Sequence, residues 1–199
     1  MAFKDLRAFI ELLENRGDLR RIQTPVSRHL EITEIADRTV KGGGPALIFE
    51  NVEGYETPLA INLFGTHQRT AWALGVDDVR ELADRIEELL GLVQSPPTGL
   101  GDKLRTLKDL SGVARTQPKT VRRAPCQEIV LEGDDADLNI LPVLKCWPMD
   151  AGPFITLPLV VSSDPETGRR NVGTYRMQVY DSRTTGMHWQ THKVGASHY

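Results

Sequence analysis

The chain has 199 residues, 40% of them hydrophobic, so it is long enough to bury a core as one large domain or two small ones. Its 24 basic and 27 acidic residues are scattered along the chain and give a net charge of -3. This balance disfavours a dedicated nucleic-acid binder, which needs an excess of Lys and Arg on one face. No apolar run could span a bilayer, and charges replace the apolar stretch of a signal peptide. We therefore expect a cytoplasmic protein with two reduced cysteines, Cys126 and Cys146.

The first hundred residues show helices alternating with strands, which predicts a small α/β layer. Apolar side chains at three- and four-residue spacings, followed by Gly17, predict an amphipathic helix over Lys4–Arg16. The Gly42–Pro45 segment lacks the ending and the following helix of a phosphate-binding loop, so it is interpreted as a turn between a helix and a strand. The other predicted elements are strands at Ala46–Glu50 and Pro58–Leu63, a short helix near Thr66 with His67, Arg69 and Trp72, and a helix capped by Asp77 that ends before Gly91.

Two polar stretches interrupt this pattern, at Ser95–Gly99 and at Arg115–Pro125. We place the domain boundary inside the second stretch, which divides the chain into residues 1–115 and 116–199. The second stretch contains four basic side chains that could attract phosphate, although a solvated linker is the stronger interpretation; they are Arg115, Lys119, Arg122 and Arg123.

The remainder of the chain is rich in β-branched and aromatic residues. Its turn-forming segments, Asp164–Gly168 and Asp181–Gly186, predict an antiparallel meander that forms part of a barrel. Such a sheet, ending at Tyr199 without a closing strand, has an unpaired edge, so we expect a truncated chain or an element supplied by another chain. The predicted strands are Glu128–Leu131, Ile155–Ser163, Asn171–Tyr180 and Thr185–His192.

Groups suited to an anionic ligand and a metal ion are concentrated after residue 170. Asn171 offers an amide oxygen and His192 an imidazole, and with a carboxylate this donor set favours Mn²⁺ or Mg²⁺. Arg176 and Lys193 could neutralise phosphate or carboxylate oxygens. Strict strand alternation puts Asn171 and Arg176 on opposite faces, so we expect a bulge near Gly173.

Two alternatives remain open for the rings and histidines of this segment. Tyr175 and Trp189 either line a flat heterocycle or are plain core aromatics. His188 and His192 are four residues apart, but the segment lacks the glutamate of a helical zinc motif and is predicted to be a strand. A zinc hydrolase is therefore disfavoured.

The strings NVGTYR (171–176) and MHWQTHKVG (187–195) resemble the flavin-and-metal signature of the UbiD family of decarboxylases. The resemblance extends to the opening FKDLRAFIELLENRGDLRRI and to the segment Asp137–Pro142, so it covers nearly the whole chain. It implies an α+β protein in which an N-terminal α/β domain precedes part of an antiparallel split β-barrel of the flavin-reductase type. It also implies reversible non-oxidative decarboxylation of an aromatic or α,β-unsaturated carboxylic acid with prenylated FMN, a Mn²⁺ ion on its phosphate and a K⁺ ion nearby.

The resemblance also implies a role for each matching residue. Asn171 and His192 match the metal ligands, and Arg176 matches the catalytic arginine that orients the substrate carboxylate. The cofactor-contacting positions are Thr174, Tyr175, Arg176, His188, Trp189, Gln190, Lys193 and Val194. In the family the third metal ligand and the catalytic acid lie further along, and no Asp or Glu follows Asp181 here, so we expect this chain alone to be inactive.

The family further implies a flavin prenyltransferase as cofactor supplier and a homo-oligomeric full-length parent. Two alternatives to an enzyme stay open. One is a non-catalytic flavin- or phosphate-binding module, and the other is a structural fragment that binds nothing in isolation.

Overall fold

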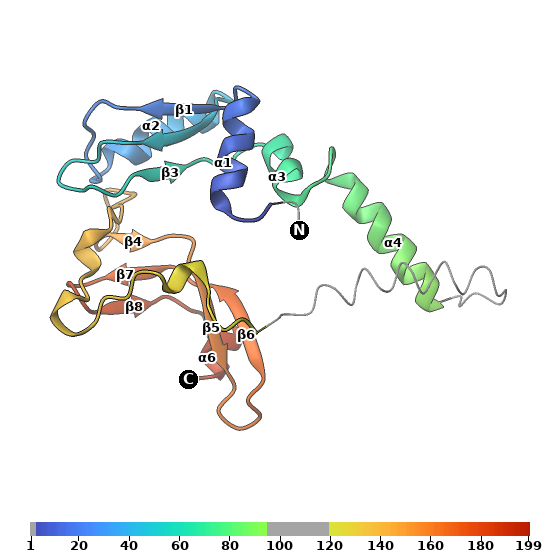
Figure 1. Cartoon of the computed structure of the whole chain (residues 1–199). Coiled ribbons are helices and arrows are strands. Elements are labelled where there is room, and N and C mark those ends of the chain that lie inside the picture. Colours follow the sequence, from blue (N-terminus) through green and yellow to red (C-terminus); the bar gives the residue numbers. More distant parts are fainter. Residues whose placement is uncertain (1–2, 95–119) are drawn as a thin grey trace. The chain divides into compact units, whose positions relative to one another are not determined.

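The computed structural model describes residues 3–94 and 120–199, which form an α+β fold (Figure 1). These residues belong to two compact units that interleave in the sequence, Met1–Phe9 with Thr66–Val130 and Ile10–Gly65 with Leu131–Tyr199. The predicted break at Ser95–Gly99 and the predicted boundary near residue 115 lie outside the described residues, and the division at 115 stays a prediction. No helix in the described part of the chain combines the length and apolar character needed to cross a membrane.

The first helix, α1 (Leu6–Asn15), confirms the predicted amphipathic helix. The Asp5 carboxylate accepts a hydrogen bond from the Ala8 N–H at 2.9 Å and so caps its start. Gly17 ends the helix with φ +69°, a conformation that glycine adopts without a steric penalty. The Asp18 N–H then donates to the Leu13 carbonyl at 2.9 Å, which satisfies a carbonyl of the last turn.

Two further helices follow the first sheet in sequence. Helix α3 (His67–Leu74) begins where predicted, because the Thr66 hydroxyl accepts the Arg69 N–H at 3.1 Å. Helix α4 (Arg80–Gln94) is also confirmed, but it continues past Gly91. Its start differs from the prediction, because the side chain that accepts the Arg80 N–H, at 2.8 Å, is Asp78 and not Asp77.

The second unit begins with a three-stranded mixed sheet. Strand β1 (Leu19–Ile22) runs parallel to β2 (Ala46–Phe49), and β3 (Leu59–Ile61) runs antiparallel to β2. The predictions of β2 and β3 are confirmed, as is the turn of glycines that joins α2 (Glu31–Lys41) to β2. Sequence reasoning missed β1 and gave no bounds for α2, although Ile32, Ile35 and Ala36 have the spacing of one helix face.

The core of this unit combines the first sheet with a segment from much later in the chain. Leu144 packs with side chains from α2, β2 and the loops at both ends of these elements: Val26, Ile32, Leu47, Phe49 and Val52. Backbone hydrogen bonds join the same two parts of the chain. The Leu30 N–H donates to the Lys145 carbonyl at 3.1 Å, and the Lys145 N–H donates to the Arg28 carbonyl at 3.2 Å. Residues 143–146 are therefore part of the same core as the N-terminal sheet.

The C-terminal strands form two small antiparallel sheets. One contains β4 (Phe154–Ile155), β7 (Met177–Val179) and β8 (Thr185–Met187), and the other contains β5 (Leu159–Ser163) and β6 (Arg170–Thr174). Both predicted turns are confirmed. In the first, the Asp164 carboxylate accepts the N–H groups of Glu166 and Thr167, each at 2.9 Å. In the second, Asp181 accepts those of Arg183 at 2.9 Å and Thr184 at 2.8 Å.

Three of the predicted strands differ from the observed elements. The predicted strands Ile155–Ser163 and Asn171–Tyr180 are each split in two, because Thr156–Pro158 and Tyr175–Arg176 separate the two sheets. The predicted strand Thr185–His192 ends at Met187, and the chain then turns into helix α6 (Val194–Ser197). The predicted strands were too long because a pattern of β-branched residues does not show where a strand changes its partner.

The predicted strand Glu128–Leu131 is wrong. The 3-10 helix η1 (Pro125–Gln127) precedes it, and the residues that follow are bends and irregular backbone. Two more 3-10 helices, η2 (Gly133–Asp135) and η3 (Leu138–Ile140), complete this region. Ile129 is 79% exposed, so the apolar character that suggested a buried strand does not correspond to burial.

The predicted bulge near Gly173 is not observed. Gly173 pairs regularly with Val160, so the prediction of an irregularity at Gly173 is wrong. Ile155 pairs with Met177 in one sheet, and Leu159 pairs with Thr174 in the other. Between these pairs, one segment has three residues (156–158) and the other has two (175–176). Pro158, which has no N–H to donate, lies in the longer of the two connections. These connections form the corner at which both chain segments pass from one sheet to the other.

Candidate functional site

The structure brings together the two predicted cofactor-contacting segments. Met177 and Met187 are paired residues of β7 and β8, and directly beside them the His188 N–H donates to the Arg176 carbonyl at 3.0 Å. The rings of Tyr175 and Trp189 meet edge to face, with 6.4 Å between their centroids. Residues 174–176 and 188–190 therefore lie next to each other at the end of the β4–β7–β8 sheet.

Tyr175 is buried between two glycines. Only 6% of its surface is exposed, and a Cβ built on Gly173 or Gly195 would lie 2.5 Å or 2.8 Å from an atom of its ring. Its hydroxyl oxygen accepts a hydrogen bond from the Gly195 N–H at 2.9 Å and one from the Asn171 amide nitrogen at 3.4 Å. These contacts favour the core-aromatic alternative for Tyr175, which attaches α6 to β6.

Asn171 lies on the inner face of the β5–β6 hairpin. It is half-buried, it pairs with Ser162, and its side chain shares a face with Gly173 because alternate strand residues point the same way. Since its amide nitrogen donates to Tyr175, its carbonyl oxygen is the atom directed away from that ring. This oxygen is the donor that a divalent cation would use.

His192 lies in the exposed turn before α6, three residues before the Gly195 N–H that bonds Tyr175. The described residues contain no group of three His, Cys, Asp or Glu side chains that could hold a metal ion. An amide oxygen and an imidazole nitrogen supply two ligands of the types that Mn²⁺ accepts, so the donor chemistry fits such an ion once a further oxygen ligand is added.

Arg176 is held by a carboxylate and an aromatic ring. Its guanidinium carbon lies 3.7 Å from the centroid of the Phe154 ring, a close cation–π stack. Its Nη2 atom lies 3.3 Å from Oδ1 of Asp150. The Arg176 side chain is 37% exposed and that of Asp150 only 13%. Sequence reasoning found Arg176 but missed Asp150 and Phe154, because they lie more than twenty residues away in the chain.

The other predicted cofactor-contacting side chains line the open side of the same region. Trp189 is half-buried, whereas Thr174, His188, Gln190, Lys193 and Val194 are exposed.

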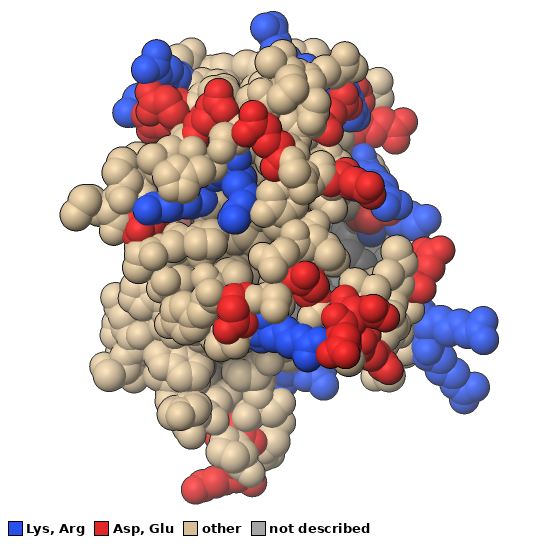
Figure 2. All heavy atoms as spheres, turned by 90° about the vertical axis from the view of Figure 1, so that its left-hand side faces the viewer, with Lys and Arg blue, Asp and Glu red and all other residues tan. Residues whose placement is uncertain are grey.

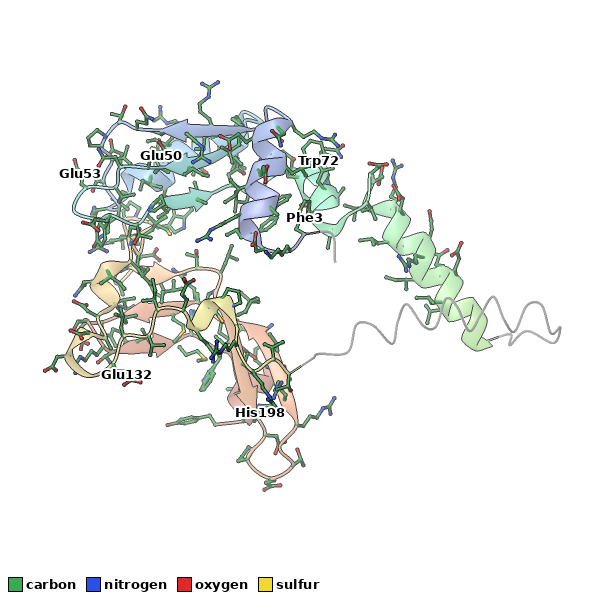
Figure 3. The ribbon with its side chains drawn as sticks, in the orientation of Figure 1. Phe3, Glu50, Glu53, Trp72, Glu132 and His198 are labelled. Atoms are coloured by element: carbon green, nitrogen blue, oxygen red, sulfur yellow. The ribbon has the colours of Figure 1, made fainter. Side chains whose placement is uncertain are left out.

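A contact that sequence reasoning missed joins β5 to the end of α6. Ser162 Oγ lies 3.0 Å from Nδ1 of His198, which is labelled in Figure 3. The face drawn in Figure 2 carries both acidic and basic side chains, so its charge is local and not of a single sign.

Cys146 lies beside this site and has a perturbed pKa. Burial raises the pKa of its thiol, an effect that the neighbouring Thr33 side chain only partly offsets. The nearby charges of Asp150 and Arg176 act on the thiol in opposite directions. Cys146 is therefore a neutral thiol at neutral pH, unlike an activated cysteine.

The fold and the sequence motifs of these segments can be compared with those of known proteins. The family model described as the 3-octaprenyl-4-hydroxybenzoate carboxy-lyase N-terminal domain matches residues 10–86, and that of the carboxy-lyase Rift-related domain matches residues 119–199. The chain belongs to the UbiD family.

Among the relatives, an uncharacterized protein of Archaeoglobus fulgidus is 48% identical over all 199 residues, which make up 40% of its length. An evolved dimeric form of the UbiD-class enzyme HmfF from Pelotomaculum thermopropionicum, in complex with prFMN, has a TM-score of 0.74 and 26% identity over 98% of this chain and 40% of its own. The closed form of vanillic acid decarboxylase from Sedimentibacter hydroxybenzoicus has a TM-score of 0.73 and 30% identity over 95% of this chain and 38% of its own. The chain thus spans about 40% of the length of these relatives.

Proposed function

We propose that the protein containing this chain catalyses the reversible, non-oxidative decarboxylation of an aromatic or α,β-unsaturated carboxylic acid with prenylated FMN. The observation that carries this proposal is the hydrogen bond from the His188 N–H to the Arg176 carbonyl, which joins the two cofactor segments. The structures of HmfF in complex with prFMN and with FMN support a flavin as the cofactor of this proposal. In this proposal the C-terminal sheets are part of a split barrel completed by other residues.

Each residue has a separate task in this mechanism. Arg176 orients the substrate carboxylate through its planar set of N–H donors. Segments 174–176 and 188–190, with Lys193 and Val194, contact the cofactor, and Tyr175 does so mainly by fixing the backbone around it. Asn171 and His192 would hold a Mn²⁺ ion against the cofactor phosphate, with a K⁺ ion nearby. When bound, the modified flavin supplies the electrophile and electron sink for the carbon chemistry.

Other components complete the activity. The proposal also needs a third metal ligand and a proton-donating acid, and it assigns neither task to a residue of this chain, so we expect the isolated chain to show no turnover. It also requires a flavin prenyltransferase as the source of the cofactor, and we propose that the full-length protein is a homo-oligomer.

The proposal can be tested on the full-length gene product purified with prenylated FMN and Mn²⁺. Release of CO₂ from a panel of aromatic and α,β-unsaturated acids is the expected result. Arg176→Ala should abolish turnover while the flavin absorbance of the purified protein is retained. Flavin binding without turnover on any acid would instead favour the non-catalytic flavin-binding alternative.

A further inference from the structure

We propose that Asp150 is the positioning residue for Arg176, and that Phe154 is the second support of the same guanidinium group. The inference rests on the proposed function, in which Arg176 orients the substrate carboxylate. Neither Asp150 nor Phe154 lies within the two cofactor segments, and each contacts Arg176 directly.

The Asp150 carboxylate is itself fixed by a tight turn. Its Oδ2 atom accepts the Trp147 N–H at 3.2 Å, and the Asp150 N–H donates to the Trp147 carbonyl at 3.1 Å. This leaves Oδ1 for the guanidinium of Arg176. The short strand that follows is anchored by the Phe154 N–H, which donates to the Leu144 carbonyl at 2.9 Å. The backbones of Asp150 and Phe154, which carry the carboxylate and the ring that hold Arg176, are therefore both fixed by hydrogen bonds.

The two contacts restrict different motions of the guanidinium. Stacking on Phe154 fixes the plane of the group, and the bond to Asp150 fixes its rotation within that plane. An unsupported arginine would lose more side-chain rotamer entropy on binding a ligand. Because Asp150 uses one edge of a group with five N–H donors, other donors can still bind a carboxylate in a two-point geometry.

The contact between Asp150 and Arg176 should affect the orientation of the substrate carboxylate differently from its binding affinity. The negative charge of Asp150 partly offsets the positive charge that Arg176 presents to a substrate carboxylate. Removal of the Asp150 charge should therefore leave substrate attraction unchanged or stronger, while the substrate loses its orientation. The expected signature is a lower kcat without a higher KM, at unchanged flavin content and thermal stability, which together distinguish it from a general loss of folding.

The test uses Asp150→Asn in the full-length, flavin-loaded protein. Asparagine keeps the size of the side chain and an oxygen that can accept the Trp147 N–H, but it removes the charge. Asp164→Asn is the matched control, because Asp164 also accepts backbone N–H groups in a turn, from Glu166 and Thr167.

We expect kcat of Asp150→Asn to fall about 10- to 100-fold with KM unchanged or lower, since small displacements of an orienting group cost this much. The control should stay within about twofold of the wild type. A wild-type kcat for Asp150→Asn would overturn the proposal, and so would a fall in kcat matched by loss of flavin and of thermal stability.

A second measurement does not depend on activity. In the isolated chain, the Phe154 ring current should shift the Arg176 side-chain NMR signals upfield, because the guanidinium lies 3.7 Å from the ring centroid. Phe154→Leu should abolish this shift, and Asp150→Asn should reduce it and accelerate exchange of the guanidinium protons. Unaltered signals in Asp150→Asn would overturn the inference. An inactive wild-type protein would instead count against the proposed function, and the NMR result would still decide the role of Asp150.

Discussion

The Tyr175 hydroxyl accepts the Gly195 N–H at 2.9 Å, and the Tyr175 ring occupies the space that a side chain at position 195 would need. This contact attaches the last helix to the β5–β6 hairpin across twenty residues of chain. It also fixes the backbone on both sides of the proposed cofactor surface, since Tyr175 directly precedes Arg176 and Gly195 follows Lys193 and Val194.

The contact predicts that Gly195→Ala destabilises the chain by about 1–3 kcal/mol, the usual cost of overpacking a filled site. Tyr175→Phe should cost about 1 kcal/mol through the loss of the hydroxyl. Urea unfolding followed by tryptophan fluorescence measures both. Gly91→Ala is the matched control, because it lies inside α4 with no atom within 4 Å of the new Cβ, and it should stabilise by about 0.5–1 kcal/mol. Equal effects at Gly195 and Gly91 would show that the ring does not fill the site.

The proposed metal site predicts a specific loss of Mn²⁺. In the full-length protein, His192→Ala and Asn171→Ala should each lower the bound Mn²⁺, measured by elemental analysis after dialysis, because each removes one ligand. Asn139→Ala is the control, since Asn139 is an exposed amide outside the proposed site. A chelator should remove Mn²⁺ from the wild type and release flavin with it. Full Mn²⁺ occupancy in both ligand variants would refute their assignment.

The pKa of Asp78 predicts an acid-sensitive step at the start of α4. Hydrogen bonds from Arg80, first from its side chain and then from its backbone, lower the pKa of Asp78 from its ordinary 3.8 to about 2. A lowered pKa in the folded state adds stability above pH 3.8, and this stability is lost as the pH falls from 3.8 towards 2. Asp78→Asn should therefore lower stability at neutral pH but have no effect near pH 2. Carbon-13 NMR titration of the carboxyl group checks the midpoint, and a midpoint near 3.8 would contradict the assignment.

The two cysteines should differ in reactivity. Cys126 is exposed, whereas Cys146 is half-buried and burial raises the pKa of its thiol. Because the thiolate is the reacting form, a disulfide reagent at pH 8 should modify Cys126 first and Cys146 more slowly. The variants Cys126→Ser and Cys146→Ser assign the two phases. Equal rates would show that Cys146 is not protected.

Local sequence patterns were sufficient for elements that local forces define. The helix end at Gly17 and the aspartate turns each depend on residues within a few positions, and these predictions were confirmed. The split of each long C-terminal strand depends on which strand lies opposite, so the sequence pattern alone could not predict the corner at residues 156–158.

The candidate site shows the same division between local and distant information. The two sequence motifs that resemble the family signature identified Arg176 and its neighbours, because these residues are consecutive in the chain. Asp150 is twenty-six residues from Arg176 and on a different element, so its contact with the guanidinium becomes visible only in three dimensions. Whether Asn171 and His192 share an ion stays a prediction.

The position of Leu144 limits how this protein can be engineered. The region matched by the Rift-related domain model contributes Leu144 to the core built on Phe49 and Val52, so the two matched regions are not independent folding modules. A chimera that joins the first region of one relative to the second region of another must keep the shapes of Leu144 and its neighbours complementary. Recombination points chosen from domain boundaries alone would leave this shared core mismatched.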